Sequence, residues 1–136
     1  MSFTFEPFKQ AEHLEEIDKW ISFWWKDKAP LPVRHLPSTG YVVRQDKLLL
    51  AAGWLYVSNS LLGWMEWIVV NPQALKPIRN EALDMLISGI LNKAAIYSVE
   101  AVVMSTPHLS LARKIKSLGF TVLEDNTTTY VRDLGV

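Results

Sequence analysis

The strongest constraint on the fold is a run of three extended segments in the first half of the chain. They are residues 41–44, Leu48–Val57 and Leu62–Val70. The third segment is rich in β-branched and aromatic residues, which favour strands. Short polar stretches at residues 45–47 and 58–60 separate the segments and are typical of turns. Consecutive strands joined by short turns pair antiparallel, so the sequence predicts a three-stranded meander.

Helical periodicity appears on both sides of this meander. Residues 10–26 and residues 79–95 carry apolar side chains three or four positions apart. The segment after the second helix, residues 100–105, contains Ala-Val-Val-Met and is expected to be a buried strand. Because a helix separates it from Leu62–Val70, we expect these two strands to pair in parallel through a right-handed crossover.

The ends of the chain complete the expected fold. Residues 3–8 read as a short strand, and Ser105 or Thr106 is expected to cap a last helix, with Pro107 in its first position. A closing hairpin is predicted from residues 120–123 and 127–131. The sequence thus predicts an α+β (mixed α/β) fold with helices on both faces of a mixed sheet, as a single domain over residues 1–136.

Composition excludes several classes of protein. Lys plus Arg and Asp plus Glu both number 14, which argues against a general nucleic-acid binder. There is no cysteine, hence no disulfide or thiolate metal site, and no metal-binding motif is present. No apolar run reaches the ~18 residues of a spanning helix, and the first residues lack the pattern of a signal peptide. A cytoplasmic protein without membrane or metal is expected.

Three segments resemble the GNAT family of N-acetyltransferases, and the resemblance covers nearly the whole chain. The sequence EWIVVNP at residues 66–72 resembles the family's fourth strand with its "V-x-P" ending. The loop and long helix that follow form the second segment. The third is residues 108–120, which end in Leu-Gly-Phe and resemble the family's N-x-x-A-x-x-x-Y-x-x-x-GF stretch. The sequences LPSTG and NP around the meander also resemble small GNAT-like proteins of tailed bacteriophages, some of which are virion or assembly components.

The resemblance implies a site for acetyl-CoA. The family's sheet splays between its fourth and fifth strands, where the cofactor's pantetheine pairs with the fourth strand, and its pyrophosphate meets the next helix. The residues so implied are Ile68, Val69, Val70, Lys76, Arg79 and Asn80. The loop departs from the family's Q/R-x-x-G-x-G/A pattern, because Leu75, Ile78 and Asn80 occupy its positions and Pro77 lacks an N–H group.

The implied catalytic residues are Glu66 and His108. Glu66 stands where many family members carry a carboxylate on the fourth strand, and a carboxylate among tryptophans is expected to have a raised pKa, as a base for an amine requires. His108 is either a second base or a structural helix cap. The family's tyrosine acid falls on Ile115, so water, Tyr97 or Tyr130 would have to serve instead.

Strict alternation along the third meander strand makes further predictions. Glu66 is expected to share a face with Trp64 and Ile68, and Trp67 to lie on the opposite face. Trp24 and Trp64 are the residues expected to line the acceptor-substrate site, although core packing explains most of the six tryptophans. His13 is expected at the surface.

Two functions therefore remain open. The first is an N-acyltransferase that moves an acetyl group from acetyl-CoA to a small-molecule or peptide amine. The second is a non-catalytic GNAT-like scaffold that has lost CoA binding and acts as a structural or interaction protein, with a protein partner or a second copy of the chain. The missing glycines favour the scaffold, whereas Glu66, Lys76 and Arg79 favour the enzyme.

Overall fold

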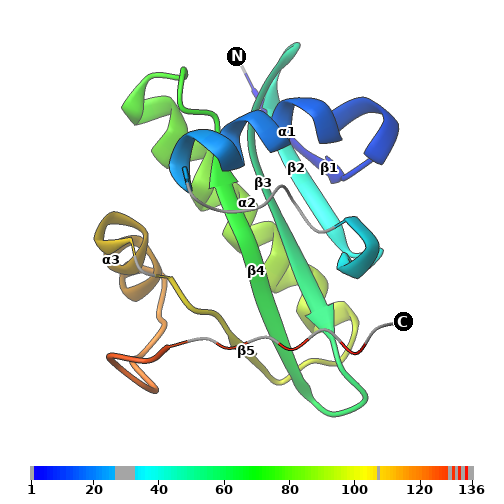
Figure 1. The fold of residues 1–136 in the computed structure, drawn as a ribbon, viewed down its shortest axis with the longest axis vertical. Coiled ribbons are helices and arrows are strands. Elements are labelled where there is room, and N and C mark those ends of the chain that lie inside the picture. The colour runs from blue at the N-terminus through cyan, green and yellow to red at the C-terminus, as the bar shows by residue number, and fades with distance from the viewer. Residues whose placement is uncertain are drawn as a thin grey trace. The chain divides into compact units, whose positions relative to one another are not determined.

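A five-stranded mixed sheet organises the first of two compact units, Met1–Met104 and Ser105–Val136 (Figure 1). In this computed structural model, residues 2–26, 33–106, 108–128, 130, 132 and 134 are described. The strands lie side by side in chain order: β1 Phe3–Pro7, β2 Gly40–Gln45, β3 Leu48–Val57, β4 Leu62–Val70 and β5 Ala101–Val103. The first four pair antiparallel and β5 pairs parallel to β4, which confirms the predicted meander and crossover.

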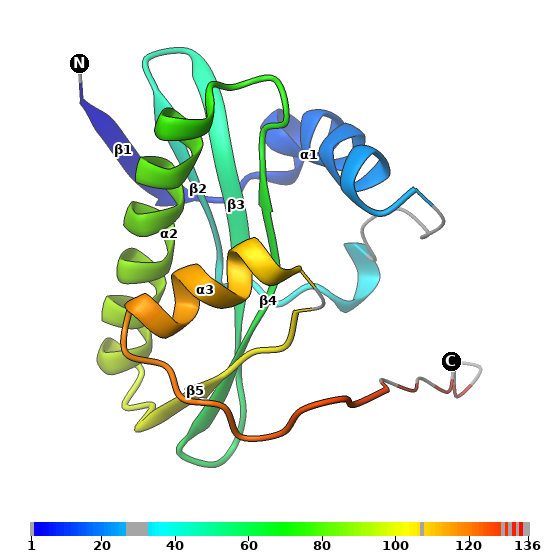
Figure 2. The same ribbon diagram turned by 90° about the vertical axis from the view of Figure 1, so that its left-hand side faces the viewer.

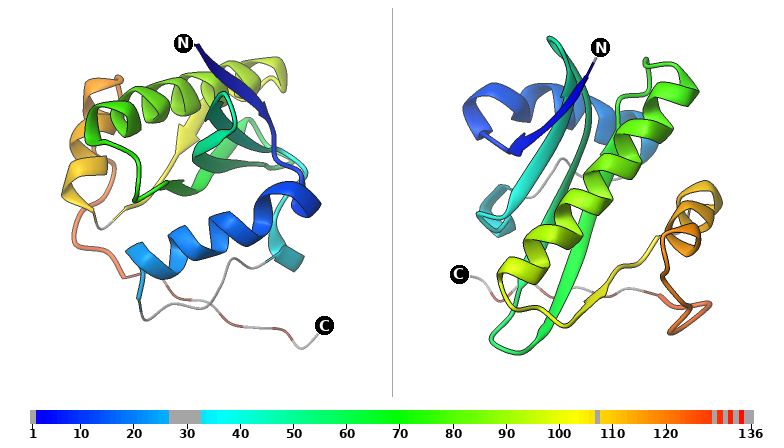
Figure 3. Two further views of the ribbon diagram at one scale, coloured as in Figure 1. Left: turned by 90° about the horizontal axis from the view of Figure 1, so that it is seen from above. Right: turned by 180° about the vertical axis from the view of Figure 1, so that it is seen from behind.

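Helices cover both faces of this sheet. Seen from above, α1 (Gln10–Trp24) and α2 (Lys76–Ile96) lie on opposite sides of the strands (left view of Figure 3). A short 3-10 helix, η1 (Val33–His35), lies between α1 and β2 in the chain. The arrangement confirms the predicted mixed α/β fold. No helix among the described residues combines the length and the apolar character needed to cross a membrane.

The core on the α1 face is centred on Trp54, which is completely buried. Ile17, Trp20 and Ile21 of α1 are buried in the same cluster, as their spacing predicts. The indole of Trp54 lies directly over Gly40 of β2. A Cβ atom built on Gly40 would lie 2.1 Å from Trp54 Nε1, so this glycine is required for the close approach of the ring.

The second unit contains α3 (Leu109–Ser117), which Figure 2 shows in yellow and orange. The helix begins later than predicted: His108 is its N-cap residue, and the His108 N–H donates to Thr106 Oγ1 over 3.1 Å. Pro107 lies outside the described residues. Residues 120–128 form no strand, so the predicted hairpin is wrong there; Thr129 and Val131 are not described. The expectation of one domain over residues 1–136 stays a prediction.

His13 is buried, which corrects the surface position expected for it. Its Nδ1 accepts the N–H of Lys9, the N-cap residue of α1, over 2.9 Å, and its Nε2 lies 3.0 Å from Arg44 Nη2. Burial, and next the positive charge of Arg44, lowers the pKa of His13 from 6.5. The imidazole therefore serves as a neutral acceptor that fixes the start of α1.

This histidine makes stability depend on pH in a defined direction. Below pH 6.5, His13 binds a proton in the unfolded chain more readily than in the folded protein. The free energy of unfolding therefore falls as the pH decreases, by at most ~1.4 kcal/mol per pH unit. We expect acidification from about pH 7 to 5 to destabilise the wild type more than His13→Gln, as measured by urea unfolding at each pH. Exposed His35→Gln is the control and should behave as the wild type. Equal pH dependence in wild type and His13→Gln would contradict this role.

Candidate active site

A β-bulge interrupts β4 at Trp67. Ala52 of β3 is opposite Val69, but Trp54, two residues further, is opposite Glu66, so β4 contains one extra residue. Trp67 absorbs this residue by adopting φ 59°, a conformation uncommon for residues other than glycine. Cross-strand partners project from the same face, so Glu66 lies with Trp54 on the face that α1 covers.

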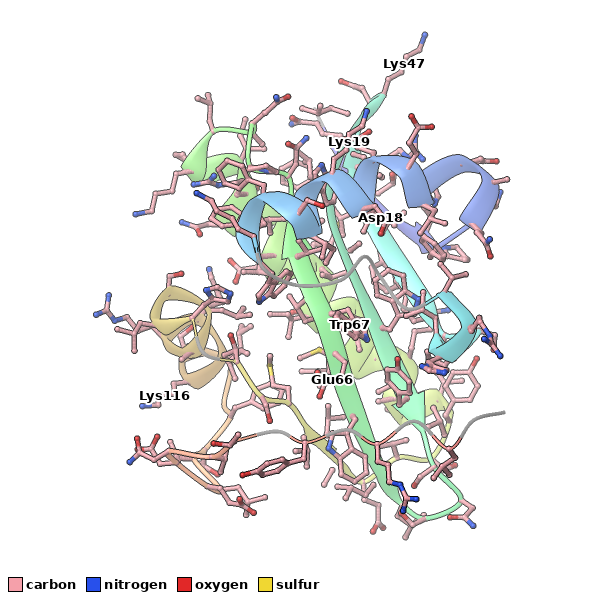
Figure 4. All side chains as sticks on the ribbon, viewed as in Figure 1. Asp18, Lys19, Lys47, Glu66, Trp67 and Lys116 are labelled. Atoms are coloured by element: carbon pink, nitrogen blue, oxygen red, sulfur yellow. The ribbon has the colours of Figure 1, made fainter. Side chains whose placement is uncertain are left out.

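The bulge overturns the alternation predicted for this strand. Trp67 packs against the α1-side core, and it therefore shares a face with Glu66 instead of opposing it (Figure 4). Ile68 points to the α2 face, where a Cβ on Gly53 would meet Ile68 Cδ1 at 2.4 Å and Leu86 Cδ2 at 3.3 Å. Strict alternation does not hold here, because one inserted residue moves every later side chain of the strand to the opposite face of the sheet.

Glu66 lies among aromatic side chains on this face. Trp64, two residues before it, is 38% exposed and is opposite Tyr56 of β3. The Tyr56 hydroxyl donates to His35 O over 3.0 Å and accepts from Trp67 Nε1 over 3.2 Å. Burial raises the pKa of Glu66, and burial together with the Glu66 charge raises the pKa of Tyr56. Glu66 is thus a carboxylate with an increased proton affinity, facing a partly exposed aromatic surface.

The same strand has an unpaired edge beyond its first residues. Only residues 62–64 of β4 pair with Ala101–Val103 of β5. Further along, the N–H of Asn71 donates to Leu50 O over 2.8 Å. In an antiparallel ladder the neighbouring residue then directs its N–H and C=O away from β3, which places those of Val70 on the open side. Within the described residues, no strand pairs with this part of β4.

The loop after β4 directs the chain from this edge into α2. Buried Asn71 donates from Nδ2 to Leu49 O over 3.0 Å and accepts the N–H of Gln73 at Oδ1 over 2.9 Å. Helix α2 then begins at Lys76 without a side-chain cap, and its second residue is Pro77. The first turn therefore presents unsatisfied N–H groups, one fewer than usual, at a helix end that attracts anions.

Three of the predicted cofactor residues lie at this helix start. Lys76 and Asn80 are exposed in the first turns of α2, and both side chains are accessible to solvent. Arg79 is half-buried, and its Nη1 donates to Pro72 O over 3.2 Å. The open edge of β4 and these basic side chains fit an elongated ligand with amide groups and phosphates.

The remaining predicted residues belong to other parts of the chain. His108 belongs to the second unit, as do Tyr130, 88% exposed, and Ile115. Tyr97 ends α2, which covers the face opposite Glu66. Sequence reasoning overlooked Tyr56, although its position two residues after Trp54 on a strand was a signal that both side chains share a face. Among the described residues, no group of three or more His, Asp or Glu side chains is placed to hold a metal ion.

Comparisons with known proteins identify the fold. No protein-family model and no curated protein sequence matches the chain. An acetyltransferase from Trypanosoma brucei has a TM-score of 0.70 and 13% identity, over 96% of this chain and 100% of that chain. AAC(6')-Iy, in complex with a bisubstrate analogue of CoA, has a TM-score of 0.70 and 16% identity, over 98% and 100%. A transcriptional regulator from Bacillus halodurans has a TM-score of 0.74 and 11% identity, over 96% and 100%. The chain thus has the mixed sheet and flanking helices of the GNAT fold.

Proposed function

We propose that the protein is an N-acyltransferase that moves an acetyl group from acetyl-CoA to a small-molecule or peptide amine. The proposal rests on one observation: three features follow one another directly along the chain. Glu66 lies on β4, the unpaired edge of β4 follows it, and the uncapped start of α2 comes directly after the loop. The likeness to AAC(6')-Iy, which was solved with a CoA-containing analogue, supports this reading.

The proposal gives the edge of β4 and the start of α2 the task of binding CoA. Val70 directs its backbone N–H and C=O to the open side, and Val70 together with Ile68 would pair with the pantetheine amides. Val69 alternates with Val70, so its backbone groups face β3, and its side chain is buried in the α1-side core; its part would be to hold the strand in place. Lys76, Arg79 and Asn80 share the helix start and would contact the phosphates together with the free N–H groups of α2.

Glu66 has the task of general base. An amine acceptor is protonated at neutral pH and must lose a proton before it attacks the thioester carbonyl. The raised pKa of Glu66 increases its proton affinity and suits it to accept that proton. The acceptor would lie against Trp64 and Trp24 on the α1 face. His108, the N-cap residue of α3, is proposed as a second base.

The direct test of the proposal is calorimetric titration with acetyl-CoA. We expect binding, and we expect Lys76→Ala to weaken it about 10-fold at low salt, because the variant loses a charge-assisted contact to phosphate. The loss should shrink as salt is added, since Lys76 is exposed and screened. Lys47→Ala removes another exposed charge, at the β2–β3 turn, and should leave the affinity unchanged (Figure 4). Equal affinities for Lys76→Ala and wild type would place the phosphates elsewhere.

A scaffold without catalysis is the second candidate function. It is favoured by two observations at the proposed CoA site: Pro77 removes one N–H donor from the helix start, and the Val70 carbonyl already accepts a hydrogen bond from Trp24. The likeness to a transcriptional regulator agrees with a GNAT fold in a protein of another class. Absence of any acetyl-CoA binding by the wild type would make the scaffold the better account.

A further inference from the structure

The last turn of α1 closes part of the open edge of β4. Trp24 Nε1 donates to Val70 O over 2.8 Å, across 46 residues of sequence. The Val70 carbonyl points to the side on which β4 has no strand partner, so the indole N–H takes the place that a donor from an added strand would take.

The Trp24 ring is itself held from two directions. Arg79 of α2 places its guanidinium carbon 5.7 Å from the centre of the ring, within range of a cation–π interaction. The Phe23 ring packs edge-on against it at 5.0 Å between centroids. Arg79 is anchored in turn to Pro72 O over 3.2 Å. These contacts join the end of α1, the end of β4 and the start of α2 at one point.

We propose that Trp24 is the residue that controls ligand pairing with the open edge of β4. This inference rests on the proposed function, because the ligand it concerns is the pantetheine chain of CoA. A pantetheine amide that approaches Val70 meets a carbonyl already occupied by the indole, so Trp24 competes with the ligand and must move away for full pairing. Its displacement also exposes the face of the Arg79 guanidinium that the ring covers. Release of Trp24 and engagement of Arg79 by a phosphate are therefore coupled.

Substitution of the competing donor tests the inference with coenzyme A as the probe. Trp24→Phe keeps an aromatic ring for Phe23 and Arg79 but removes the N–H group. We expect coenzyme A to bind this variant about 2- to 10-fold more tightly by calorimetry, because one net hydrogen bond no longer opposes binding. Trp20→Phe, one turn earlier in α1 and buried in the core, is the matched control and should not gain affinity.

A second measurement on the wild type does not depend on how the variant folds. The indole N–H signals are recorded by nuclear magnetic resonance, and the signal that Trp24→Phe lacks belongs to Trp24. Saturating coenzyme A should shift this signal and accelerate its exchange with water. If coenzyme A binds but the Trp24 signal stays unchanged, or if Trp24→Phe binds no more tightly, this inference is wrong while the proposed function stands. If neither protein binds coenzyme A, both are wrong.

Discussion

Glu66→Gln is expected to reduce the rate of amine acetylation at pH 7 by about 100- to 10,000-fold, the usual contribution of a positioned general base. Glutamine preserves the size of the side chain and cannot accept the proton of the acceptor. The defect should diminish at high pH, where the amine has already lost its proton. Rates are measured across pH with an amine that the wild type acetylates, selected from a panel of small amines and peptides.

The pH profile separates a lost base from a damaged site. A distorted pocket would reduce the rate at every pH, whereas a missing base is compensated as the pH rises. Stability supplies an independent control. Because burial raises the pKa of Glu66 above 4.5, ionisation of this group destabilises the folded protein as the pH rises through that range, so Glu66→Gln should be at least as stable as the wild type at pH 7. An unchanged rate at all pH values would make Glu66 structural.

Gly40→Ala is expected to be the most destabilising methyl addition among the strand positions of the α1 face. The new Cβ would overlap Trp54 Nε1 at 2.1 Å, and this indole is completely buried, so the ring or the strand must shift. Overpacking of this kind costs about 1–3 kcal/mol, and the degree of overlap places this variant at about 3 kcal/mol or beyond. Denaturant unfolding measures the change through the midpoint at constant slope.

Gly63→Ala is the matched control for this effect. It makes the same substitution in β4, where the nearest atoms to the added Cβ lie at 3.2–3.3 Å and need to move only slightly. The reduced entropy of the unfolded chain offsets part of that cost, so a change of about 1 kcal/mol or less is expected. Similar losses of stability in the two variants would show that the contact with Trp54 does not determine whether the position of Gly40 accepts a larger residue.

The elements of the sheet were predictable because their signals are local. The third and second meander segments match β4 and β3 at both ends, since period-two patterns and turn residues are read from neighbouring positions. The parallel pairing of β5 followed from the helix before it, because parallel strands are joined by a crossover that usually contains a helix. The predicted hairpin failed at residues 120–128, because a strand needs a partner whose presence no local pattern guarantees.

The candidate site was predicted in its parts and not in its geometry. Glu66 and the start of α2 were found from the resemblance and the order of elements. The bulge was not found, because a tryptophan at position 67 does not indicate a positive φ. Gly53, on the opposite strand, is only a weak signal of a bulge. The contacts of His13 with Arg44 and of Trp24 with Val70 join residues 31 and 46 positions apart, so only tertiary packing brings them together.

The unpaired edge of β4 would also determine how the proposed enzyme distinguishes between ligands. A strand edge offers donors and acceptors at the repeat of a polypeptide backbone, and any extended chain of amides matches that repeat. Recognition along the edge is therefore generic, and another protein's strand would satisfy it as well as a cofactor. Discrimination must come from the two ends of the edge. In the proposed function, Lys76 and the N–H groups of α2 would select for negative charge at one end, and Glu66 and Trp64 would select for an amine at the other. A ligand that lacks either group would still pair with the strand, but it would dissociate quickly.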